Sequence, residues 1–508
     1  MSSIPQIPPV HKWGQMLTFS VLEQLYPREV VSELLSQDQA EEQRERKLTH
    51  LVMVYLLIAW SLMARSALRR VCDRLGRALR LGSEAPLPAT PTSAAFCYRR
   101  RQLGVRVLRH LFQRLCTPFA TQETRGSFAF GLRLMGIDGT KLAVAASPEN
   151  RACFSPRDAD ASSTASPFPH LQAVLCVEIG THAIVDAIPA LAGVGESRLA
   201  FGLLRSIRAD MLVLLDRNFV SAAFLQGLRK RQAHVLARLA SNRLVGKGQL
   251  LSDGSRLLTL TPKQYPELSA PLTVRVISYR LHPEAVALLE QVTPSHSQHG
   301  SGTHNPKVGE VHRLVTTLLD PEQYPALDLC LLYHERWEIE LVIDEIKEHQ
   351  RLAQHPLVSK SLICVFQEFY ALLLAHYALR VLMGRAALLA QVDPDRISFT
   401  QAIELVADAL LLAPVLAPAH QCRLLARVVD DLSRPEWLLP PRRLRFNSRV
   451  IKRSRNRFQI KRADHLFFSA KHFLFLSDPP HASFRDLILI YLSLAQINGH
   501  MPRSQQPL

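Results

Sequence analysis

Two short apolar segments of this chain each end abruptly in an aspartate, and this pattern constrains the fold more than any other feature. Leu132–Ile137 is followed by Asp138, and Met211–Leu215 is followed by Asp216. A run of about five apolar residues that stops at a polar turn is typical of a buried β-strand. Such strands present carboxylates at a sheet edge, where metal-dependent phosphoryl transfer uses them, although an aspartate that merely starts a turn gives the same pattern.

Helical periodicity dominates the residues before these strands. Apolar residues recur at a spacing near 3.6 over 17–35, 48–81 and 93–115, which predicts helices there. From Phe128 onward the pattern changes to strands, and the region from 245 to 325 contains three further strand-like runs. The chain therefore reads as α/β, with helices at both ends.

The charge balance points to a polyanionic partner. The 508 residues carry a formal net charge of +17, which favours nucleic acid first and a membrane surface second. The predicted helix after Pro91 is compatible with a helix-turn-helix-like contact to DNA, and a basic surface helix without groove contact is the alternative. A second basic block lies at 442–462. The candidate DNA-binding residues of the two segments are Arg99, Arg100, Arg101, Arg449, Lys452 and Arg453.

Cysteine spacing and hydropathy indicate a cytoplasmic protein. None of the eight cysteines forms a C-x2-C pair, so they read as buried thiols in a reducing compartment. The longest apolar run, Leu51–Ala64, is too short to span a bilayer and lacks the layout of a signal peptide. We expect this run to form a buried core helix, and we expect no membrane partner.

The segment 332–347 carries a charged pattern at helical spacing. Tyr333, Arg336, Glu340 and Lys347 fall within an arc of roughly 60° on an ideal α-helix. A carboxylate that holds a metal, between cations that hold phosphates, suits phosphoryl transfer, whereas a solvated helix face with ion pairs explains the spacing equally well. Asp344 lies one turn from Glu340 on nearly the same face, and spacing alone does not choose between them.

These motifs together resemble the DDE transposases of bacterial insertion sequences, in the insertion-sequence-four branch with the Tyr-Arg-Glu-Lys signature. Asp138-Gly139-Thr140 resembles the family's first catalytic aspartate and Asp216-Arg217-Asn218-Phe219 its second. The signature Y-x2-R-x3-E-x6-K is complete from Tyr333 to Lys347 and selects Glu340 over Asp344. The resemblance runs from about residue 17 to 462, and Arg275 lies in a stretch similar to the family's β-strand insertion.

The resemblance implies a ribonuclease-H-like catalytic core interrupted by a mostly β insertion. A helical DNA-binding domain would precede it and a helical C-terminal region would follow it. The expected divisions are 1–125 for the N-terminal domain, 126–244 and 326–435 for the core, 245–325 for the insertion and 436–508 for the basic C-terminal region.

The resemblance also implies a transposase that cleaves and joins DNA at terminal inverted repeats, by cut-and-paste through hairpin ends. Asp138, Asp216 and Glu340 would be the catalytic residues and the ligands of two Mg²⁺ ions, with Mn²⁺ as a substitute. Tyr333, Arg336 and Lys347 would grip phosphates. The expected partners are double-stranded DNA, at transposon ends and target, and a second copy of the chain. The expected place is the bacterial cytoplasm, at the nucleoid when DNA is bound.

Two other functions use the same residues. A catalytically silent, transposase-derived regulator would bind DNA without cutting it, and a stand-alone metal nuclease would cut without recognising ends. One departure from the family concerns base stacking, because none of the four tryptophans lies between Asp216 and Arg336. Tyr265 or Tyr279 is the candidate replacement.

Overall fold

A computed structural model describes residues 19–42, 48–63, 66–82, 90–155, 168–239, 248–281, 310–351, 355–441 and 473–475. The chain divides into two compact units. The first contains residues 1–124, 139–199 and 339–440, and the second contains 125–138, 200–338 and 441–508. The basic block at 442–462, with Arg449, Lys452 and Arg453, lies outside the described residues.

Helices dominate the first unit. Those from the N-terminal part of the chain are α2 (Ser20–Leu25), α3 (Arg28–Gln37), α4 (His50–Leu62), α5 (Leu68–Gly82), α6 (Ser93–Leu103) and α7 (Arg106–Leu115). Those that come later are α8 (Pro148–Phe154), α14 (Leu362–Leu389), α15 (Phe399–Leu412) and α16 (Pro418–Leu432).

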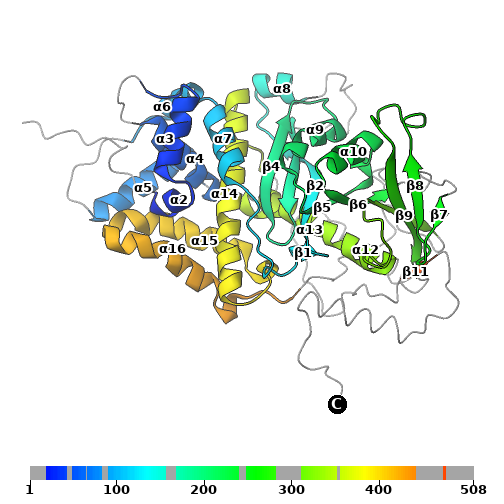
Figure 1. Cartoon of the computed structure of the whole chain (residues 1–508). Helices are drawn as coiled ribbons and strands as arrows, with labels where there is room; N and C mark the ends of the chain where they lie inside the picture. Colours follow the sequence, from blue (N-terminus) through cyan, green and yellow to red (C-terminus); the bar gives the residue numbers. More distant parts are fainter. Residues whose placement is uncertain are drawn as a thin grey trace, which may run out of the picture. The chain divides into compact units, whose positions relative to one another are not determined.

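The long helix α14 is the centre of this unit, where α4, α7, α15 and α16 pack around it (Figure 1). Its length and apolar composition would suffice to cross a bilayer, but 78% of its most apolar window is buried inside the protein. Helix α4 is buried along almost its whole length, as expected for the apolar run near residue 51. Both helices therefore have the burial of core helices.

Local chemistry explains where the helices begin and end. Thr92 accepts a hydrogen bond from the backbone N–H of Ala95 and so caps α6. The helix predicted over 93–115 is broken at Gly104, whose φ of 66° ends α6 before α7 begins. Pro27 separates α2 from α3, which splits the helix predicted over 17–35.

One strand, β2 (Leu132–Ala143), contributes residues to both units. In the first unit it neighbours β3 (His170–Glu178), which forms an antiparallel hairpin with β4 (Ala183–Ala190). Helix α9 (Glu196–Leu203) follows this hairpin.

In the second unit β2 pairs in parallel with β5 (Met211–Leu215), and β5 pairs in parallel with β6 (His234–Leu239). Helix α10 (Ala222–Lys230) connects β5 to β6, and β1 (Phe128–Ala129) pairs with the start of β2. The hairpin that neighbours β2 in the first unit, and the parallel strands that follow from it in the second, confirm the predicted α/β, ribonuclease-H-like core.

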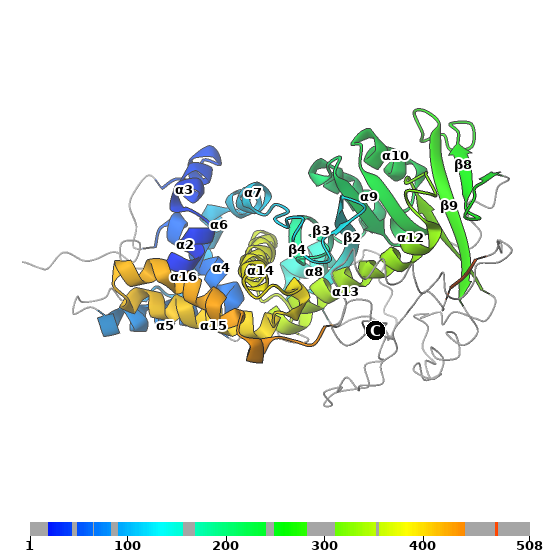
Figure 2. The same cartoon turned by 60° about the horizontal axis from the view of Figure 1, so that its bottom comes forward.

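The sheet of the second unit continues beyond β6 through antiparallel strands (Figure 2). These are β10 (Val311–Thr316), β9 (Leu272–Leu281), β8 (Arg256–Leu260) and β7 (Gln249–Leu250), with β11 (Phe473–Phe475) pairing with β9. The mostly β character expected of the insertion is present. It extends the sheet of this unit.

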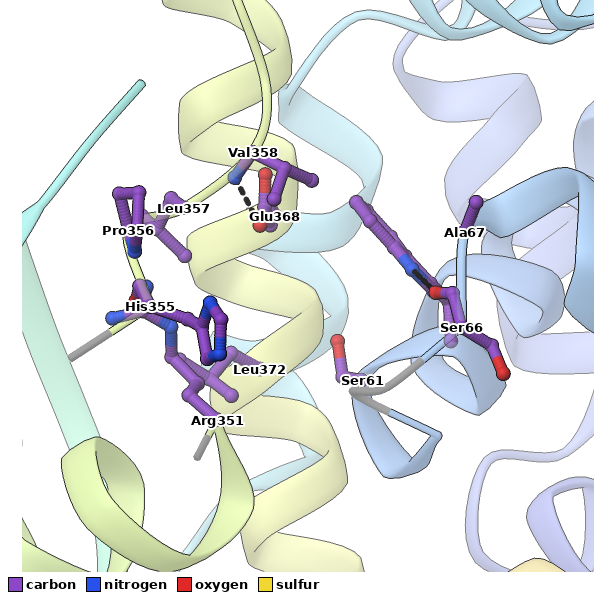
Figure 3. Close-up of a pocket in the computed structure, with 11 residues that line it drawn as sticks. Ser61, Ser66, Ala67, Arg351, His355, Pro356, Leu357, Val358, Glu368 and Leu372 are labelled. Carbon is purple, nitrogen blue, oxygen red and sulfur yellow. Dashed lines mark hydrogen bonds between the residues drawn. The ribbon is translucent and has the colours of Figure 1, made fainter. Parts of the chain in front are cut away.

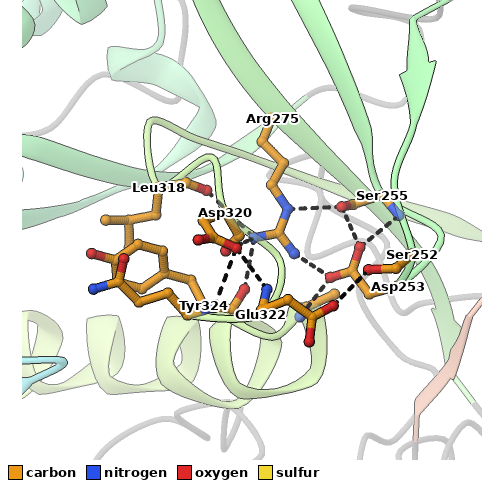
Figure 4. A network of polar contacts seen from close by, with 10 residues as sticks. Ser252, Asp253, Ser255, Arg275, Leu318, Asp320, Glu322 and Tyr324 are labelled. Atoms are coloured by element: carbon orange, nitrogen blue, oxygen red, sulfur yellow. Dashed lines mark hydrogen bonds and ion pairs between the residues drawn. The ribbon is translucent and has the colours of Figure 1, made fainter.

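A buried arginine ties this β region to the segment that leads into α12 (Ala326–Leu332). Arg275 of β9 is 0% exposed; it donates to Ser255 Oγ and pairs with Asp253, and it also donates to the backbone carbonyls of Leu318, Asp320 and Tyr324 (Figure 4). Asp253 also accepts the backbone N–H of Ala326, at the first turn of α12. The network thereby fixes the start of the helical segment that carries the signature.

Candidate active site

The two aspartates lie side by side in the second unit. Ile137 of β2 is the register partner of Leu215 of β5, and Asp138 and Asp216 are the next residues along these parallel strands. The segment predicted to end at Ile137 is longer than expected, because β2 continues to Ala143. Asp138 is therefore not at the end of its strand. It lies where the pairing of β2 with β5 ends.

Asp216 has a local structural role as well. It follows β5 in extended conformation, and its Oδ1 accepts the backbone N–H of Arg217 at 2.7 Å, which starts a short 3₁₀ turn. The residue thus both starts a turn and presents a carboxylate at the strand end. These two interpretations of the sequence pattern are compatible.

Two residues of the signature meet these strands within the second unit. The hydroxyl of Tyr333 donates to the backbone carbonyl of Leu215 at 3.1 Å. Burial raises the pKa of Tyr333 to about 12, although the Arg336 cation opposes the rise. Arg336 Nη1 lies 3.6 Å from Asp138 Oδ2, with side chains 12% and 21% exposed. A cation and a hydroxyl are thus held beside the aspartate pair.

The signature segment is not one regular α-helix. Tyr333–Arg336 forms a 3₁₀ turn, α13 (Trp337–Asp344) is α-helical, and Glu345–Gln350 forms a π-helical turn. A 3₁₀ turn brings residues three apart onto one line, so Tyr333 and Arg336 share a face more closely than α geometry predicts. Because the π turn has a different periodicity, the ideal arc calculated for Lys347 does not apply.

Glu340 and Lys347 belong to the first unit. Glu340 lies on α13, one helical turn after Arg336, and is partly exposed. Lys347 lies close enough to β3 to affect its first residue, because burial and the charges of Lys141 and Lys347 together lower the pKa of His170. Among the described residues, no group of three or more carboxylate, histidine or cysteine side chains is gathered tightly enough to hold a metal ion.

Asp344 has a local partner. Its Oδ2 lies 3.4 Å from His349 Nε2 on the following π turn, and this contact raises the pKa of His349. An ion pair within the same helical segment gives Asp344 a structural partner.

The glycine after Asp138 allows a close approach that the sequence pattern did not reveal. In the first unit the carboxyl group of Glu196, at the start of α9, lies against Gly139, so a Cβ at position 139 would overlap it. Only glycine leaves room for a backbone–carboxyl contact of this kind. Glu196 was not among the predicted site residues, and its sequence surroundings gave no signal of this contact.

A buried ionic cluster anchors the π turn inside the first unit. Glu345 receives His182 Nδ1 at 2.8 Å and His376 Nε2 at 3.0 Å, and it also pairs with Arg380. Burial alone would raise the pKa of Glu345, but Arg380 and His182 outweigh it and hold the pKa well below its usual range.

The basic residues predicted on α6 have different surroundings. Arg99 and Arg100 are each 6% exposed. Arg99 pairs with Glu42, and Arg100 donates to Gln367 at 3.1 Å and to the carbonyl of Cys364 at 2.7 Å. Arg101, in contrast, is exposed. The guanidinium groups of Arg99 and Arg100 therefore make contacts inside the first unit.

A cavity of about 650 Å³ lies elsewhere in the first unit (Figure 3). Trp60 and Ser66 line one side, and Arg351, His355 and Leu372 line another. It contains none of the predicted catalytic residues.

The candidate stacking residues are placed as follows. Tyr279 is 7% exposed and packs against His312 at a ring-centroid distance of 5.4 Å. Tyr265 is partly exposed. Tyr265 is thus the more exposed of the two tyrosines, and stacking on a base requires an accessible ring.

Comparison with known proteins gives consistent matches along the chain. Residues 16–113 match the family model of the insertion element 4 transposase N-terminal region, and residues 133–377 match that of the transposase DDE domain. The transposase InsG for insertion sequence element IS4 of Escherichia coli (strain K12) is 26% identical over 434 residues, which cover 84% of this chain and 90% of that protein. The putative transposase InsZ of the same strain is 23% identical over 45% of this chain and 75% of its own length. A cryo-EM structure of the piggyBac transposase synaptic complex with hairpin DNA aligns with a TM-score of 0.43 and 11% identity, over 82% of this chain and 85% of that one.

Proposed function

Because this chain belongs to the IS4-type transposases with a DDE domain, enzymes that cleave and join DNA, we propose that it binds the terminal inverted repeats of an insertion sequence. It would cleave DNA there and transfer the strands by cut-and-paste. The observation that carries this proposal is that Asp138 and Asp216 each follow the last paired residue of neighbouring parallel strands, with Arg336 3.6 Å from Asp138.

Asp138, Asp216 and Glu340 would hold two Mg²⁺ ions, for which Mn²⁺ would substitute. The chemistry of the donors suits these ions, because Mg²⁺ prefers carboxylate oxygens. Asp138 and Asp216 each follow the last paired residues of β2 and β5, and the described residues bring no third such ligand to them. Bound metal would supply activation of a water or a 3′-hydroxyl and would neutralise charge on the leaving oxygen. Glu340 would come to the aspartates from α13, which continues directly from the turn that holds Arg336.

The signature residues would orient DNA by binding its phosphates. Arg336, whose planar guanidinium suits two parallel hydrogen bonds, would grip a phosphate oxygen pair, and Lys347 would make a point contact. Tyr333 would act mainly by holding the strand end, since its hydroxyl donates to Leu215. In this arrangement, a phosphate that recruits Arg336 would relieve the contact of Arg336 with Asp138.

Further DNA contacts would come from basic residues outside the core. Arg101 is the accessible arginine of the three predicted on α6, whereas DNA contact by Arg99 or Arg100 would require their internal contacts to open. Arg449, Lys452 and Arg453 would contact the backbone from the C-terminal region. The proposal also includes domain boundaries at residues 125, 244, 325 and 435. It further includes hairpin intermediates at the DNA ends, action in the cytoplasm, and a homodimer that holds two transposon ends.

The test is cleavage of a duplex that carries the inverted repeat flanking this coding sequence, with Mg²⁺ present. We expect nicks at the repeat end, and we expect Asp216→Asn to bind the duplex while nicking it at least about 10²-fold more slowly. Wild-type binding without nicking would favour a silent regulator. Equal nicking of an unrelated duplex would favour a general nuclease.

A further inference from the structure

The register of the second unit places a third polar residue in line with the two aspartates. Ile137, Leu215 and Ala237 are register partners across β2, β5 and β6, and all three are fully buried or nearly so. The next residue on each strand is Asp138, Asp216 and Arg238, and each of these is partly exposed. Because the three strands are parallel and in register, these next residues lie on one face of the sheet, at the edge where β5 ends.

The described residues give Arg238 no acidic partner. In the parts of the chain that the structure describes, its closest polar contact is from Nη2 to His312 Nδ1 at 3.4 Å, and it makes no ion pair with a carboxylate. Arg336 differs, since it lies 3.6 Å from Asp138. A half-buried guanidinium that is not neutralised by an acid is suited to an incoming anion.

The pKa of Tyr333 indicates that the charge of Arg238 lies near the Tyr333 hydroxyl. Burial raises the pKa of Tyr333, and Arg336 and Arg238 both oppose the rise while Asp216 adds to it. The Tyr333 hydroxyl is itself fixed on the carbonyl of Leu215. The two arginines and Asp216 therefore all act on one hydroxyl at the end of β5.

We propose that Arg238 is a further phosphate-binding residue, which holds a DNA phosphate on the Asp216 side of the aspartate pair. This inference rests on the proposed function, because it assumes that DNA enters at this edge. Arg336 would approach that DNA from the signature segment and Arg238 from β6, so that two guanidinium groups would bind the backbone beside the cleaved bond. A purely structural arginine that only bridges β6 to His312 of β10 would make no DNA contact.

The salt dependence of binding separates these two roles. Each phosphate contact to duplex DNA contributes about 0.9 to the slope of log affinity against log salt concentration. We would measure this slope for wild type, Arg238→Ala, Arg238→Lys and Arg231→Ala, with the inverted-repeat duplex and without Mg²⁺. Arg231 is the matched control, because it is an exposed arginine that precedes the opposite end of β6.

We expect Arg238→Ala to lower the slope by about 1 and the affinity by about ten-fold, with Arg231→Ala unchanged. Arg238→Lys retains the charge and should restore most of the slope. A slope for Arg238→Ala equal to that of wild type would overturn the proposal, whether or not affinity falls. If Arg238→Ala folds poorly, Arg238→Gln takes its place, because it keeps a long polar side chain without the charge, and a slope equal to that of wild type would then overturn the proposal.

Nicking is scored in a separate reaction with Mg²⁺. Absence of nicking by wild type would contradict the proposed function, while the slopes measured without metal would still decide the role of Arg238.

Discussion

At the scale of single residues, position 139 has no room for any side chain. Its backbone lies against the Glu196 carboxyl group, so Gly139→Ala must displace either that side chain or β2, next to Asp138. We expect a loss of about 1–3 kcal/mol in the free energy of unfolding and slower nicking. Gly195→Ala is the control, because a Cβ there meets no atom within 4 Å. Equal nicking rates for Gly139→Ala and Gly195→Ala would contradict the claim that the contact between Gly139 and Glu196 matters for the position of Asp138.

Asp328, also at this scale, should make stability depend on pH. Burial raises its pKa to about 6, and its Oδ1 is buried with no hydrogen-bond partner among the described residues. A carboxyl with a raised native pKa stabilises the fold below its unfolded pKa near 4, and this contribution is lost as the pH rises through about 6.

Asp328→Asn should therefore stabilise the protein at pH 7 by about 1 kcal/mol, after discounting for partial exposure, and should give no gain at pH 4. Urea unfolding of both proteins at the two pH values measures this. The same gain at both pH values would show that the carboxyl is not the cause.

At the scale of elements, the π turn depends on the ionic cluster of Glu345. This carboxylate joins the β3–β4 turn, through His182, to α14, through His376 and Arg380. We expect Glu345→Ala to cost about 3–5 kcal/mol, because it leaves the buried Arg380 guanidinium without its partner. Arg434→Ala, which breaks an exposed pair with Asp431, should cost under about 1 kcal/mol.

The sign of the pH effect is opposite to that of Asp328. The native pKa of Glu345 is held low, so its contribution is present above the unfolded pKa of about 4.3 and is lost as the pH falls through the native value. Chemical unfolding of wild type and Glu345→Ala from pH 7 down to pH 3 should show the difference between them shrinking on the acid side. A constant difference would contradict this.

The same elements show how far the sequence predicts structure. The bounds of β5 follow from the sequence, because an apolar run between polar turns is a local signal. The break at Gly104 does not follow, since apolar periodicity does not register a left-handed residue. Burial of Arg100 was also missed, because its partner Gln367 is remote in the chain. The π-helical form of Glu345–Gln350 depends on tertiary contacts such as those of Glu345 with His182 and His376. The spacing of apolar residues in the sequence gives no information about such contacts.

At the scale of the whole molecule, the excess of positive charge should appear as salt-sensitive DNA binding. With a net charge of +17 and contacts to about 6–10 phosphates, we expect affinity for the inverted-repeat duplex to fall by about 10³–10⁵ between 50 and 200 mM salt. Chelation of divalent ions should stop nicking, and binding should persist. An affinity that hardly changes with salt concentration in filter-binding or fluorescence-anisotropy titrations would exclude a complex held mainly by contacts to DNA phosphates.

The parallel register of β2, β5 and β6 also bears on how this protein comes to be active. Parallel strands are joined only through crossovers, so bringing Asp138 beside Asp216 requires the chain to close over a long stretch of sequence. A slip of one residue in either strand would turn its aspartate to the opposite face. A chain in which these strands are out of register would therefore lack the assembled aspartate pair, which ties the proposed cutting to correct folding of the sheet.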